Sequence, residues 1–371
     1  MQLPKYDAYL LDFPQQTATV ILLWVHEVCD SCKFGGLILK EKLTLVTGAT
    51  GFVGSELVSR LIRDGINTRA CVRHANVVLP NEAHVVQVGD MTGDVDWRHI
   101  LKDVGDVVHA AARVHVMNDT ATDPLVEFRS VNVLGTLNLA RQAATAGVRR
   151  FLFISSVKVN GEVTELNSPF FAEDTPAPLD PYGVSKMEAE NGLRTIATET
   201  GMDVVIIRPP LVYGPGVKAN FEALMRAVRH RWPLPLGSVD NQRSLVALDN
   251  LVDFIVTCIT HPQAVNQTFL VSDGHDLSTT ELVRGMAQAA GVPARLLPVP
   301  VWALQAGANL LGKGDAVQRL CGNLQVDISK ARTLLGWVPP VSVEEGLRRA
   351  MGAGLPRYAR NDGINSAQRP T

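Results

Sequence analysis

Between residues 43 and 207 the chain alternates between short apolar runs and longer amphipathic segments. A short apolar run bounded by turn residues is typical of a strand buried on both faces of a parallel sheet, and a longer segment with apolar positions every three to four residues is typical of a surface helix. This alternation predicts an α/β fold with a doubly wound parallel sheet and helices on both faces. The expected strands are Leu43–Thr47, Thr68–Val72, Val85–Asp90, Asp106–Ala110 and Arg150–Ser155, and the helices include Glu56–Arg63 and Pro124–Ala146.

Beyond residue 211 the pattern predicts shorter elements of a smaller α/β lobe. Phe221–Val228 is expected to be a helix, and prolines break the loop Trp232–Gly237. Strands are expected at 244–248 and 267–271, and helices are expected to begin near residues 250 and 279. The apolar segment Val301–Leu311 is far shorter than the ~20 residues of a membrane-spanning helix, so we expect it to be a core helix. A helix that packs on a partner or lies near lipid-linked glycan machinery is the alternative.

Composition and charge limit the class of protein. The 371 residues are 46% apolar and 19% charged, which suits a soluble globular protein and excludes a mainly disordered one. The 35 Lys and Arg residues nearly balance the 37 Asp and Glu residues, so the basic excess of a nucleic-acid-binding surface is absent. Five scattered cysteines argue against a secreted protein built on disulfides.

Residues 1–41 precede the first expected strand. The apolar run Ala18–Val25 is too short to span a membrane and follows no basic segment, so we expect neither a membrane span nor a secretory signal. Cys29 and Cys32 have CxxC spacing, but no second pair of ligands follows that would complete a zinc site. We therefore expect a loosely ordered N-terminal extension, no bound metal and a cytoplasmic protein.

The first strand leads directly into a glycine-rich turn and then a helix, with the spacing GxxGxxG. In this context the first glycine permits a tight turn, the second lets the backbone approach a pyrophosphate, and the third lets the helix pack on the strand. The N–H groups at the start of the helix then face the phosphates. The residues predicted to bind a dinucleotide here are Gly48, Thr50, Gly51, Phe52, Val53 and Gly54.

The residues that follow the next strands bear on which dinucleotide binds. A site selective for NAD usually has an acid about 20 residues past the glycines, where this chain has Cys71 and Val72. Arg73 is placed to pair with a 2′-phosphate, which slightly favours NADP(H) over NAD; an Arg that merely faces solvent is the alternative. Further cofactor contacts are expected from Asp90 and Met91 at the adenine and from Ala110, Ala111 and Ala112, where the cofactor would press on the backbone.

Two motifs carry side chains suited to acid–base chemistry. Ser155 and Ser156 end a predicted strand, at the edge where open α/β sheets bind ligands. Tyr182 and Lys186 are four residues apart and share one helix face. An ammonium near the phenol is expected to lower the pKa of Tyr182, which would then exchange a proton with a substrate hydroxyl or carbonyl. We predict that Ser156 holds the same oxygen and that Lys186 also binds the nicotinamide ribose.

Together these motifs resemble the extended short-chain dehydrogenase/reductase family, and within it the nucleotide-sugar epimerase/dehydratase group. The resemblance runs from about residue 42 to residue 350 and includes the segment Arg208–Gly216 and matches between Asp327 and Gly346. It implies a Rossmann domain at 42–210, a substrate lobe at 211–350 that is interleaved with it, and a C-terminal tail at 351–371.

The resemblance also assigns further residues to the cofactor and to assembly. Asn132 joins the cofactor site, and Pro209 and Val212 line the nicotinamide. In this family the helices that correspond to 124–146 and 182–200 commonly pair across a two-fold axis. A homodimer through these helices is therefore expected.

On the substrate side, Asn220 and Arg243 match positions that grip the diphosphate in this family, and Lys158 falls within the substrate site. From the residues alone, Asn220 also fits a helix N-cap, and Arg243 also fits a charge at a strand edge. Arg319 is the nearest candidate for the second Arg that clamps the distal diphosphate. A UDP-sugar is the expected partner.

Departures from the family pattern narrow the activity. The 4,6-dehydratases have Asp-Glu directly after the catalytic Ser or Thr, and this chain has Val157 and Lys158 there, so dehydration is not expected. Leu211, Asn160 and Asn250 replace the usual Asn, Tyr and Asp at their positions. The stretches Ser155–Glu162, Arg208–Phe221 and Arg243–Asp253 look most like a subgroup from bacterial polysaccharide clusters, such as those for O-antigen.

Two activities of that subgroup share hydride exchange between nicotinamide C4 and sugar C4. A 4-epimerase acting on UDP-glucose or UDP-N-acetylglucosamine keeps its NAD⁺, turns the 4-keto intermediate over and returns the hydride. A reductase of a 4-keto-6-deoxy UDP-N-acetylhexosamine, which forms UDP-N-acetylquinovosamine, binds NAD(P)H and releases the oxidised cofactor. The sequence supports the 4-epimerase and the reductase almost equally. A non-catalytic redox sensor is a third alternative, which the retained Ser156, Tyr182 and Lys186 disfavour.

Overall fold

The computed structural model describes residues 42–74, 77–114, 123–310, 312 and 314–352. The expectations for residues 1–41, including the pair Cys29 and Cys32, and for the tail beyond residue 352 lie outside this part of the chain. The cofactor and substrate residues predicted from the sequence all lie within it.

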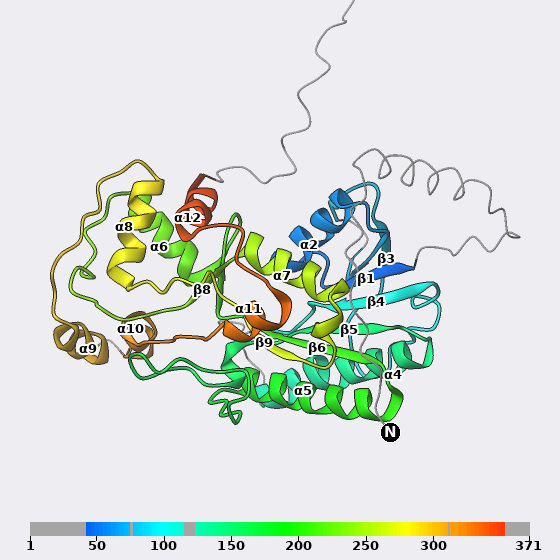
Figure 1. Cartoon of the computed structure of the whole chain (residues 1–371). Helices are drawn as coiled ribbons and strands as arrows, with labels where there is room; N and C mark the ends of the chain where they lie inside the picture. The colour runs from blue at the N-terminus through cyan, green and yellow to red at the C-terminus, as the bar shows by residue number, and fades with distance from the viewer. Residues whose placement is uncertain (1–41, 75–76, 115–122, 311, 313, 353–371) are drawn as a thin grey trace, which may run out of the picture. The chain divides into compact units, whose positions relative to one another are not determined.

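Seven parallel strands form the main sheet, in the order β3-β2-β1-β4-β5-β6-β9 (Figure 1). The first six follow the order of a doubly wound fold, in which ligands bind where the strand order reverses, here between β1 and β4. The predicted fold class is therefore confirmed. The strands are β1 (Leu43–Thr47), β2 (Thr68–Val72), β3 (His84–Gln87), β4 (Val104–His109), β5 (Arg150–Ile154), β6 (Asp203–Arg208) and β9 (Thr268–Leu270).

Strand β3 ends at Gln87, earlier than the expected Asp90. Its partner β2 ends at Val72, which pairs with Gln87, so the residues that follow have no strand to continue the ladder. Gly89 then adopts a positive φ of 78°, which breaks the extended conformation. Asp90 consequently lies in a loop at the carboxyl edge of the sheet.

Helices cover both faces of the main sheet. One face packs against α2 (Phe52–Arg63), α7 (Leu248–Thr260) and α11 (Ser329–Leu335), and the other against α4 (Thr136–Thr145) and α5 (Pro181–Thr200) (Figure 1). Successive strand residues alternate between the two cores: Val108 packs on the side of α2, and Val107 on the side of α4. Burial on both faces explains why the strands read as continuous apolar runs.

The helix expected at 124–146 is divided into three parts. They are α3 (Pro124–Arg129), a π-helical turn η1 (Ser130–Gly135) and α4. At the end of the π-helical turn, a Cβ on Gly135 would lie 2.3 Å from the carbonyl oxygen of Met91, so the helix passes very close to the loop after β3. Wide turns of this kind are frequent at functional sites.

A second lobe is built from residues beyond 210. Strands β7 (Leu211–Tyr213) and β8 (Leu245–Ala247) form a two-stranded parallel sheet. Helices α6 (Ala219–Arg229), α8 (Thr279–Ala289) and α12 (Val343–Gly352) supply much of the core that these strands share (Figure 1). Strand β9 comes from the same stretch of sequence but pairs with β6 of the main sheet. The domain boundary at residue 210 stays a prediction.

The apolar segment near residue 300 forms α9 (Val301–Leu310), followed by α10 (Gly314–Cys321). The expectation of a core helix is wrong, because Ala308 is the only residue of α9 that is fully buried, while Trp302 is 75% exposed and Leu310 is 89% exposed. A helix that is apolar all round carries no pattern that indicates which face is covered. Within the described ranges, no helix is both long and apolar enough to cross a membrane.

The junction of β1 and α2 is the tightest turn near the predicted cofactor site. Gly48 has a φ of +66°, and a Cβ there would lie 2.7 Å from the backbone nitrogen of Ala111. A Cβ on Gly54 would lie 2.1 Å from the carbonyl oxygen of Gly48. The roles that the sequence predicted for these two glycines, a tight turn and close packing of helix on strand, agree with this geometry.

Gly54→Ala is expected to lower the free energy of unfolding by ~1–3 kcal/mol, because the new methyl group meets backbone that cannot move independently. The matched control is Gly307→Ala in α9, where a Cβ meets no atom within 4 Å and the helix gains stability of ~0.5–1 kcal/mol. Urea denaturation of both variants checks this. Equal stability of Gly54→Ala and the wild type would contradict the close approach.

Candidate active site

The predicted dinucleotide-binding residues lie together where β1 and β4 end. Ala110 N donates to Thr47 O at 3.3 Å, and Ala111 N donates to Thr47 Oγ1 at 3.4 Å, which places this alanine run beside Gly48. Helix α2 follows Gly51, has no side-chain cap and has no acidic residue in its first turn. An uncapped helix start of this kind, with glycine on its approach, fits a pyrophosphate. Thr50 and Gly51 are exposed at the turn, and Phe52 and Val53 are partly buried.

Arg73 and Asp90 form an ion pair of 3.1 Å between Nε and Oδ1. Both side chains are largely exposed, 64% and 76% respectively, so the pair contributes little to stability. Met91 is partly buried against the core on the side of α4. The pairing balances the charge of Arg73 and weakens the argument that this guanidinium selects a 2′-phosphate.

Lys186 is buried and connects α5 to the end of β5. Its Nζ donates to Ile154 O at 2.8 Å and lies 4.4 Å from the ring centre of Phe153 and 5.9 Å from that of Tyr182. Burial lowers the pKa of Lys186 to about 7, against the opposing effect of Glu190. The contact with Ile154 holds the start of α5 against the strand that leads into Ser155 and Ser156.

The expectation that Lys186 lowers the pKa of Tyr182 is wrong for the protein by itself. Burial raises the pKa of Tyr182 well above its usual value, and the negative charge of Asp180 raises it further. The reason lies in the position of the Lys186 ammonium, which donates to a backbone carbonyl, while the effects named for Tyr182 are its burial and the charge of Asp180. Spacing of four residues places the two side chains on one face but does not fix where either group points.

The two serines of the Ser155–Ser156 pair have different partners. Ser156 is partly buried, and its Oγ accepts from Lys158 N at 3.2 Å, which caps the short 3₁₀ helix η2 (Val157–Val159). Ser155 is buried, and its Oγ donates to Glu190 Oε1 at 2.6 Å. Ser156 therefore caps η2, directly after the strand that Lys186 contacts, whereas Ser155 belongs to a buried network.

That network centres on an ion pair between Glu190 and Arg208, which the sequence analysis did not identify. Arg208 donates from Nε to Oε1 at 2.9 Å and from Nη2 to Oε2 at 2.6 Å, and neither residue has appreciable exposed surface. Burial alone would raise the pKa of Glu190, but Arg208, Ser155 and Arg194 together outweigh burial and hold that pKa below its usual value. The available signal was an arginine at the end of the buried strand β6 and a glutamate four residues after Lys186, on the same helix face.

The same guanidinium reaches the loop after η2. Arg208 Nη1 donates to Asn160 Oδ1 at 2.9 Å, and Asn160 Nδ2 donates to Phe171 O at 2.8 Å. Asn160, the residue that departs from the family's usual Tyr, is thus a structural link between β6 and the loop at Phe171. Ser155, Glu190, Arg208 and Asn160 together tie α5 to the carboxyl ends of β5 and β6.

Asn132 and His109 are two buried polar residues with several hydrogen-bond partners each. Asn132, in the π-helical turn, accepts from Arg113 N at 2.8 Å and donates to Arg113 O at 3.0 Å and to Ser185 Oγ at 3.0 Å. His109 lies between the hydroxyls of Thr47 and Thr136, at 2.8 and 2.9 Å. Burial and the charge of Lys186 lower the pKa of His109 to about 3, so its ring is neutral. Asn132 therefore positions the loop after β4 against α5.

Residues predicted for the substrate are spread over several segments. Asn220 is exposed in the first turn of α6, directly after Ala219 with a φ of +59°. Because Lys218 holds the N-cap position of α6, the alternative that Asn220 is the N-cap is wrong. Lys158 Nζ pairs with Glu162 Oε1 at 2.9 Å and with Asp180.

Arg243 is half-buried and bridges two further segments. It pairs with Leu277 and Leu324 in isolated β-bridges, which agrees with the alternative of a charge at a strand edge. Its Nη1 donates to Gly322 O at 3.0 Å, and burial lowers its pKa. Gly322 directly follows α10, so Arg243 lies close to the helix that carries Arg319.

Of the two residues predicted to line the nicotinamide, Pro209 is buried, and its carbonyl accepts from Val157 N at 3.0 Å. Val212 lies in β7 and is partly buried against the core on the side of α2. These contacts place Pro209 beside η2 and hence beside Ser156. The two residues flank the start of the second lobe.

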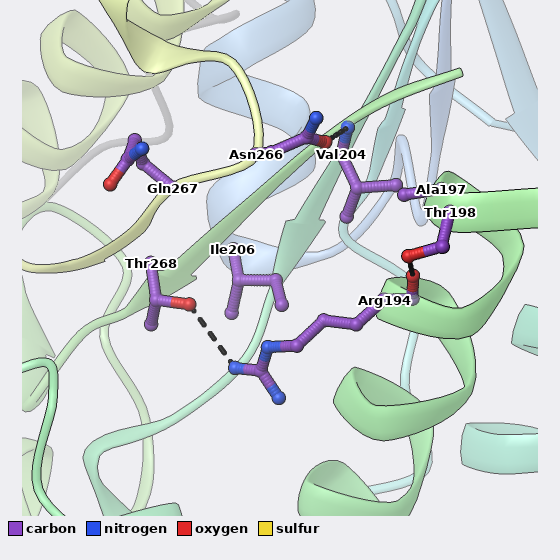
Figure 2. A pocket seen from close by; sticks show the side chains of 8 residues that line it. All are labelled: Arg194, Ala197, Thr198, Val204, Ile206, Asn266, Gln267 and Thr268. Atoms are coloured by element: carbon purple, nitrogen blue, oxygen red, sulfur yellow. Dashed lines mark hydrogen bonds between the residues drawn. The ribbon is translucent and has the colours of Figure 1, made fainter. Parts of the chain in front are cut away.

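Two cavities elsewhere in the described residues do not coincide with this site. One of about 200 Å³ lies between α5 and the edge of the sheet and includes Arg194, Ile206 and Thr268 (Figure 2). Arg194 Nη2 donates to Thr268 Oγ1 at 3.1 Å there, so its polar lining is partly satisfied. The other, of about 590 Å³, lies beside α4 and includes Asn138 and Gln142.

In the part of the chain that the structure describes, no group of three or more His, Cys, Asp or Glu side chains is arranged to hold a metal ion.

Known proteins with similar sequences or folds indicate the family to which this chain belongs. The model of the NAD dependent epimerase/dehydratase family matches residues 44–272. A UDP-glucose 4-epimerase of Vibrio cholerae is 52% identical over 316 residues, covering 85% of this chain and 96% of that protein. An N-acetyl-α-D-glucosaminyl-diphospho-ditrans,octacis-undecaprenol 4-epimerase of Escherichia coli O157:H7 is 27% identical, covering 83% of this chain and 93% of that protein. The structure of MoeE5 in complex with UDP-glucose and NAD has a TM-score of 0.66 at 25% identity, covering 83% of this chain and 97% of that one.

The fold and the site define an enzyme of the extended short-chain dehydrogenase/reductase class. The chain belongs to the NAD-dependent epimerase/dehydratase family. Its cofactor is NAD, in agreement with the family's description. The slight preference for NADP(H) that was based on Arg73 finds no support.

Arg208→Met is expected to lower the free energy of unfolding by ~3–5 kcal/mol, because it leaves the buried Glu190 carboxylate without its main counter-charge. Arg194→Met is the matched control: Arg194 also pairs with Glu190, at 2.9 Å, but its side chain is 43% exposed, so a loss of at most ~1 kcal/mol is expected. Urea denaturation at neutral pH checks both values. Similar losses in the two variants would contradict a central role for the buried pair.

Proposed function

We propose that this enzyme is a UDP-sugar 4-epimerase and that UDP-glucose is its substrate. The observation that carries the proposal is the contact between Lys186 Nζ and Ile154 O, which joins the helix of Tyr182 and Lys186 to the end of β5, directly before Ser155 and Ser156. The 52% identity to a UDP-glucose 4-epimerase over nearly the whole of that protein supports the substrate. The reductase alternative has no comparable support.

Within this proposal, the chain's own residues handle the proton of the C4 hydroxyl. Tyr182 accepts that proton during oxidation and returns it during reduction, and Ser156 donates a hydrogen bond to the same oxygen. Bound NAD supplies the chemistry that side chains lack, the reversible acceptance of a hydride. Lys186 holds the nicotinamide ribose, and its ammonium lies 5.9 Å from the centre of the Tyr182 ring. Since burial raises the pKa of Tyr182, positive charge near the phenol is needed for this cycle.

The remaining site assignments belong to the same proposal. Gly48–Gly54 and Ala110–Ala112 bind the pyrophosphate and neighbouring backbone positions of NAD, and Pro209 and Val212 line the nicotinamide. Arg243 binds the substrate diphosphate, with Asn220 and Lys158 at other parts of the substrate. The closeness of Arg243 to α10 supports Arg319 as a second diphosphate contact.

A lipid-linked sugar is a second candidate substrate. The observation that favours it is the exposure of α9, whose Trp302 and Leu310 face outward. The Escherichia coli relative is named for a substrate that carries its sugar on an undecaprenyl diphosphate. Both substrates present a diphosphate to the same residues and differ in what lies beyond it.

A homodimer and a cytoplasmic location stay predictions. The pairing surface that we propose is formed by α3, η1, α4 and α5. Val126 and Leu134 on the first two of these elements are 56% and 58% exposed, which is consistent with apolar side chains that a second copy would cover.

Purified enzyme is expected to convert UDP-glucose to UDP-galactose with no NAD, NADH or NADPH added, as followed by proton NMR. Conversion of an undecaprenyl diphosphate-linked N-acetylglucosamine alone would establish the second candidate. Failure of both, with NADPH consumed in the presence of a 4-keto-6-deoxy UDP-N-acetylhexosamine, would establish the reductase instead.

Tyr182→Phe is expected to lower kcat by at least ~100-fold and to leave UDP-glucose binding, measured by calorimetry, nearly unchanged, because only the transferable proton is lost. The matched control is Tyr213→Phe. The hydroxyl of Tyr213 donates to Asp273 Oδ2 at 2.7 Å in the second lobe, so this variant loses ~1 kcal/mol of stability but keeps its turnover. Normal turnover of Tyr182→Phe would contradict the acid–base assignment.

A further inference from the structure

Lys158 stands between two carboxylates at the edge of the proposed active site. Its Nζ lies 2.9 Å from Glu162 Oε1 and also donates to Asp180 Oδ2. It belongs to η2, which begins directly after Ser156 and is capped by that serine. Lys158 is therefore tied to the segment that carries one catalytic side chain and, through Asp180, to the helix that carries the other two.

Asp180 has a separate contact for each of its two carboxylate oxygens. Oδ1 accepts from Gly183 N at 2.7 Å and so caps the first turn of α5, while Oδ2 accepts from Lys158. A Cβ on Gly183 would lie 2.9 Å from Lys158 O, which shows how closely η2 and the first turn of α5 are packed. The carboxylate is consequently fixed two residues before Tyr182.

The charges around Tyr182 come from three directions. On its own helix are Asp180 and Lys186, and on η2 is Lys158. On the side of α3, the ring of Phe128 packs 6.0 Å from that of Tyr182, with Arg113 beyond it paired to Glu127. From β4, His109 approaches Lys186 and is neutral.

Among these groups, Asp180 is the one whose charge opposes loss of the Tyr182 proton, in addition to burial. An ionised Tyr182 would place a second negative charge near this carboxylate. The ammonium of Lys158 is the counter-charge of Asp180, and its own pKa is raised by Asp180 and Glu162 in spite of its burial, so it stays charged at neutral pH.

We propose that Lys158 is a positioning residue that acts through Asp180: it neutralises the carboxylate that caps α5, so that no uncompensated negative charge lies two residues before Tyr182 when the Tyr182 hydroxyl gives up its proton. The inference rests on the role of Tyr182 in the proposed function. This role also suits a lysine at position 158, where the 4,6-dehydratases have an acidic residue.

The test is the ionisation of Tyr182 in the NAD-loaded protein, measured by ultraviolet difference absorption between each variant and the same variant with Tyr182→Phe. Lys158→Met is expected to move the midpoint to higher pH by about one unit, because Asp180 loses its counter-charge. Lys158→Arg keeps the charge and the wild-type midpoint. Asp180→Asn moves the midpoint to lower pH, and the double variant Lys158→Met/Asp180→Asn returns it close to the wild-type value.

Two controls separate this effect from a general change in structure. Glu162→Gln removes the other carboxylate on Lys158 and is expected to leave the midpoint within a few tenths of a unit, because Asp180 is the carboxylate that acts on Tyr182. Lys330→Met breaks an exposed ion pair with Glu173 and is expected to change nothing. An unmoved midpoint in Lys158→Met, or a double variant that behaves like Lys158→Met alone, would overturn the proposal. If Lys158→Met does not fold, an unmoved midpoint in Asp180→Asn overturns it equally.

Kinetics distinguish this proposal from the proposed function. In an active 4-epimerase, the acidic limb of kcat/KM for UDP-glucose moves to higher pH in Lys158→Met by the same amount as the Tyr182 midpoint, whereas a lost substrate contact of Lys158 lowers kcat/KM equally at every pH. If the wild type does not epimerise UDP-glucose, the proposed function fails, while the titration still decides the relation between Lys158, Asp180 and Tyr182.

Discussion

The buried ion pair between Glu190 and Arg208 is the interaction on which the geometry of the active site depends. Two charges without access to water are tolerated only when each is fully paired, and removal of either partner leaves a cost of several kcal/mol. The pair fixes α5, which carries Tyr182 and Lys186, to the end of β6, and Ser155 extends the connection to β5. The pair thus positions the helix that carries two of the three proposed catalytic side chains, and Ser155 connects it to the residue before the third, Ser156.

Burial also acts on titratable groups at and near this site, because it disfavours their charged forms. It raises the pKa of Tyr182 and lowers those of Lys186 and His109. A reversible proton transfer by Tyr182 therefore depends on individual charged groups near its hydroxyl rather than on the net charge of the protein. The ion pair of Lys158 and Asp180 at the start of α5 suits that need.

Much of the fold and the outline of the site could be predicted from the sequence, because both depend on local patterns. Strands buried on both faces read as apolar runs, the glycines of the β1–α2 turn are required by close backbone contacts, and Tyr182 and Lys186 are spaced for one helix face. The π-helical turn inside 124–146, the exposure of α9, the direction of the Lys186 ammonium and the pairing of Glu190 with Arg208 could not be predicted. Each of these depends on partners far away in the sequence, and the pKa of Tyr182 was expected to shift in the wrong direction for the same reason.

The central claim, a 4-epimerase that keeps its cofactor through the whole cycle, is tested most directly by identifying the nucleotide that the purified protein carries. Denaturation of the protein followed by mass spectrometry of the released nucleotide gives its identity and its amount per chain. A retained cofactor predicts NAD in nearly equal molar amount to the protein. A protein that is empty as purified and becomes saturated by NADPH would contradict this account and point to a reductase.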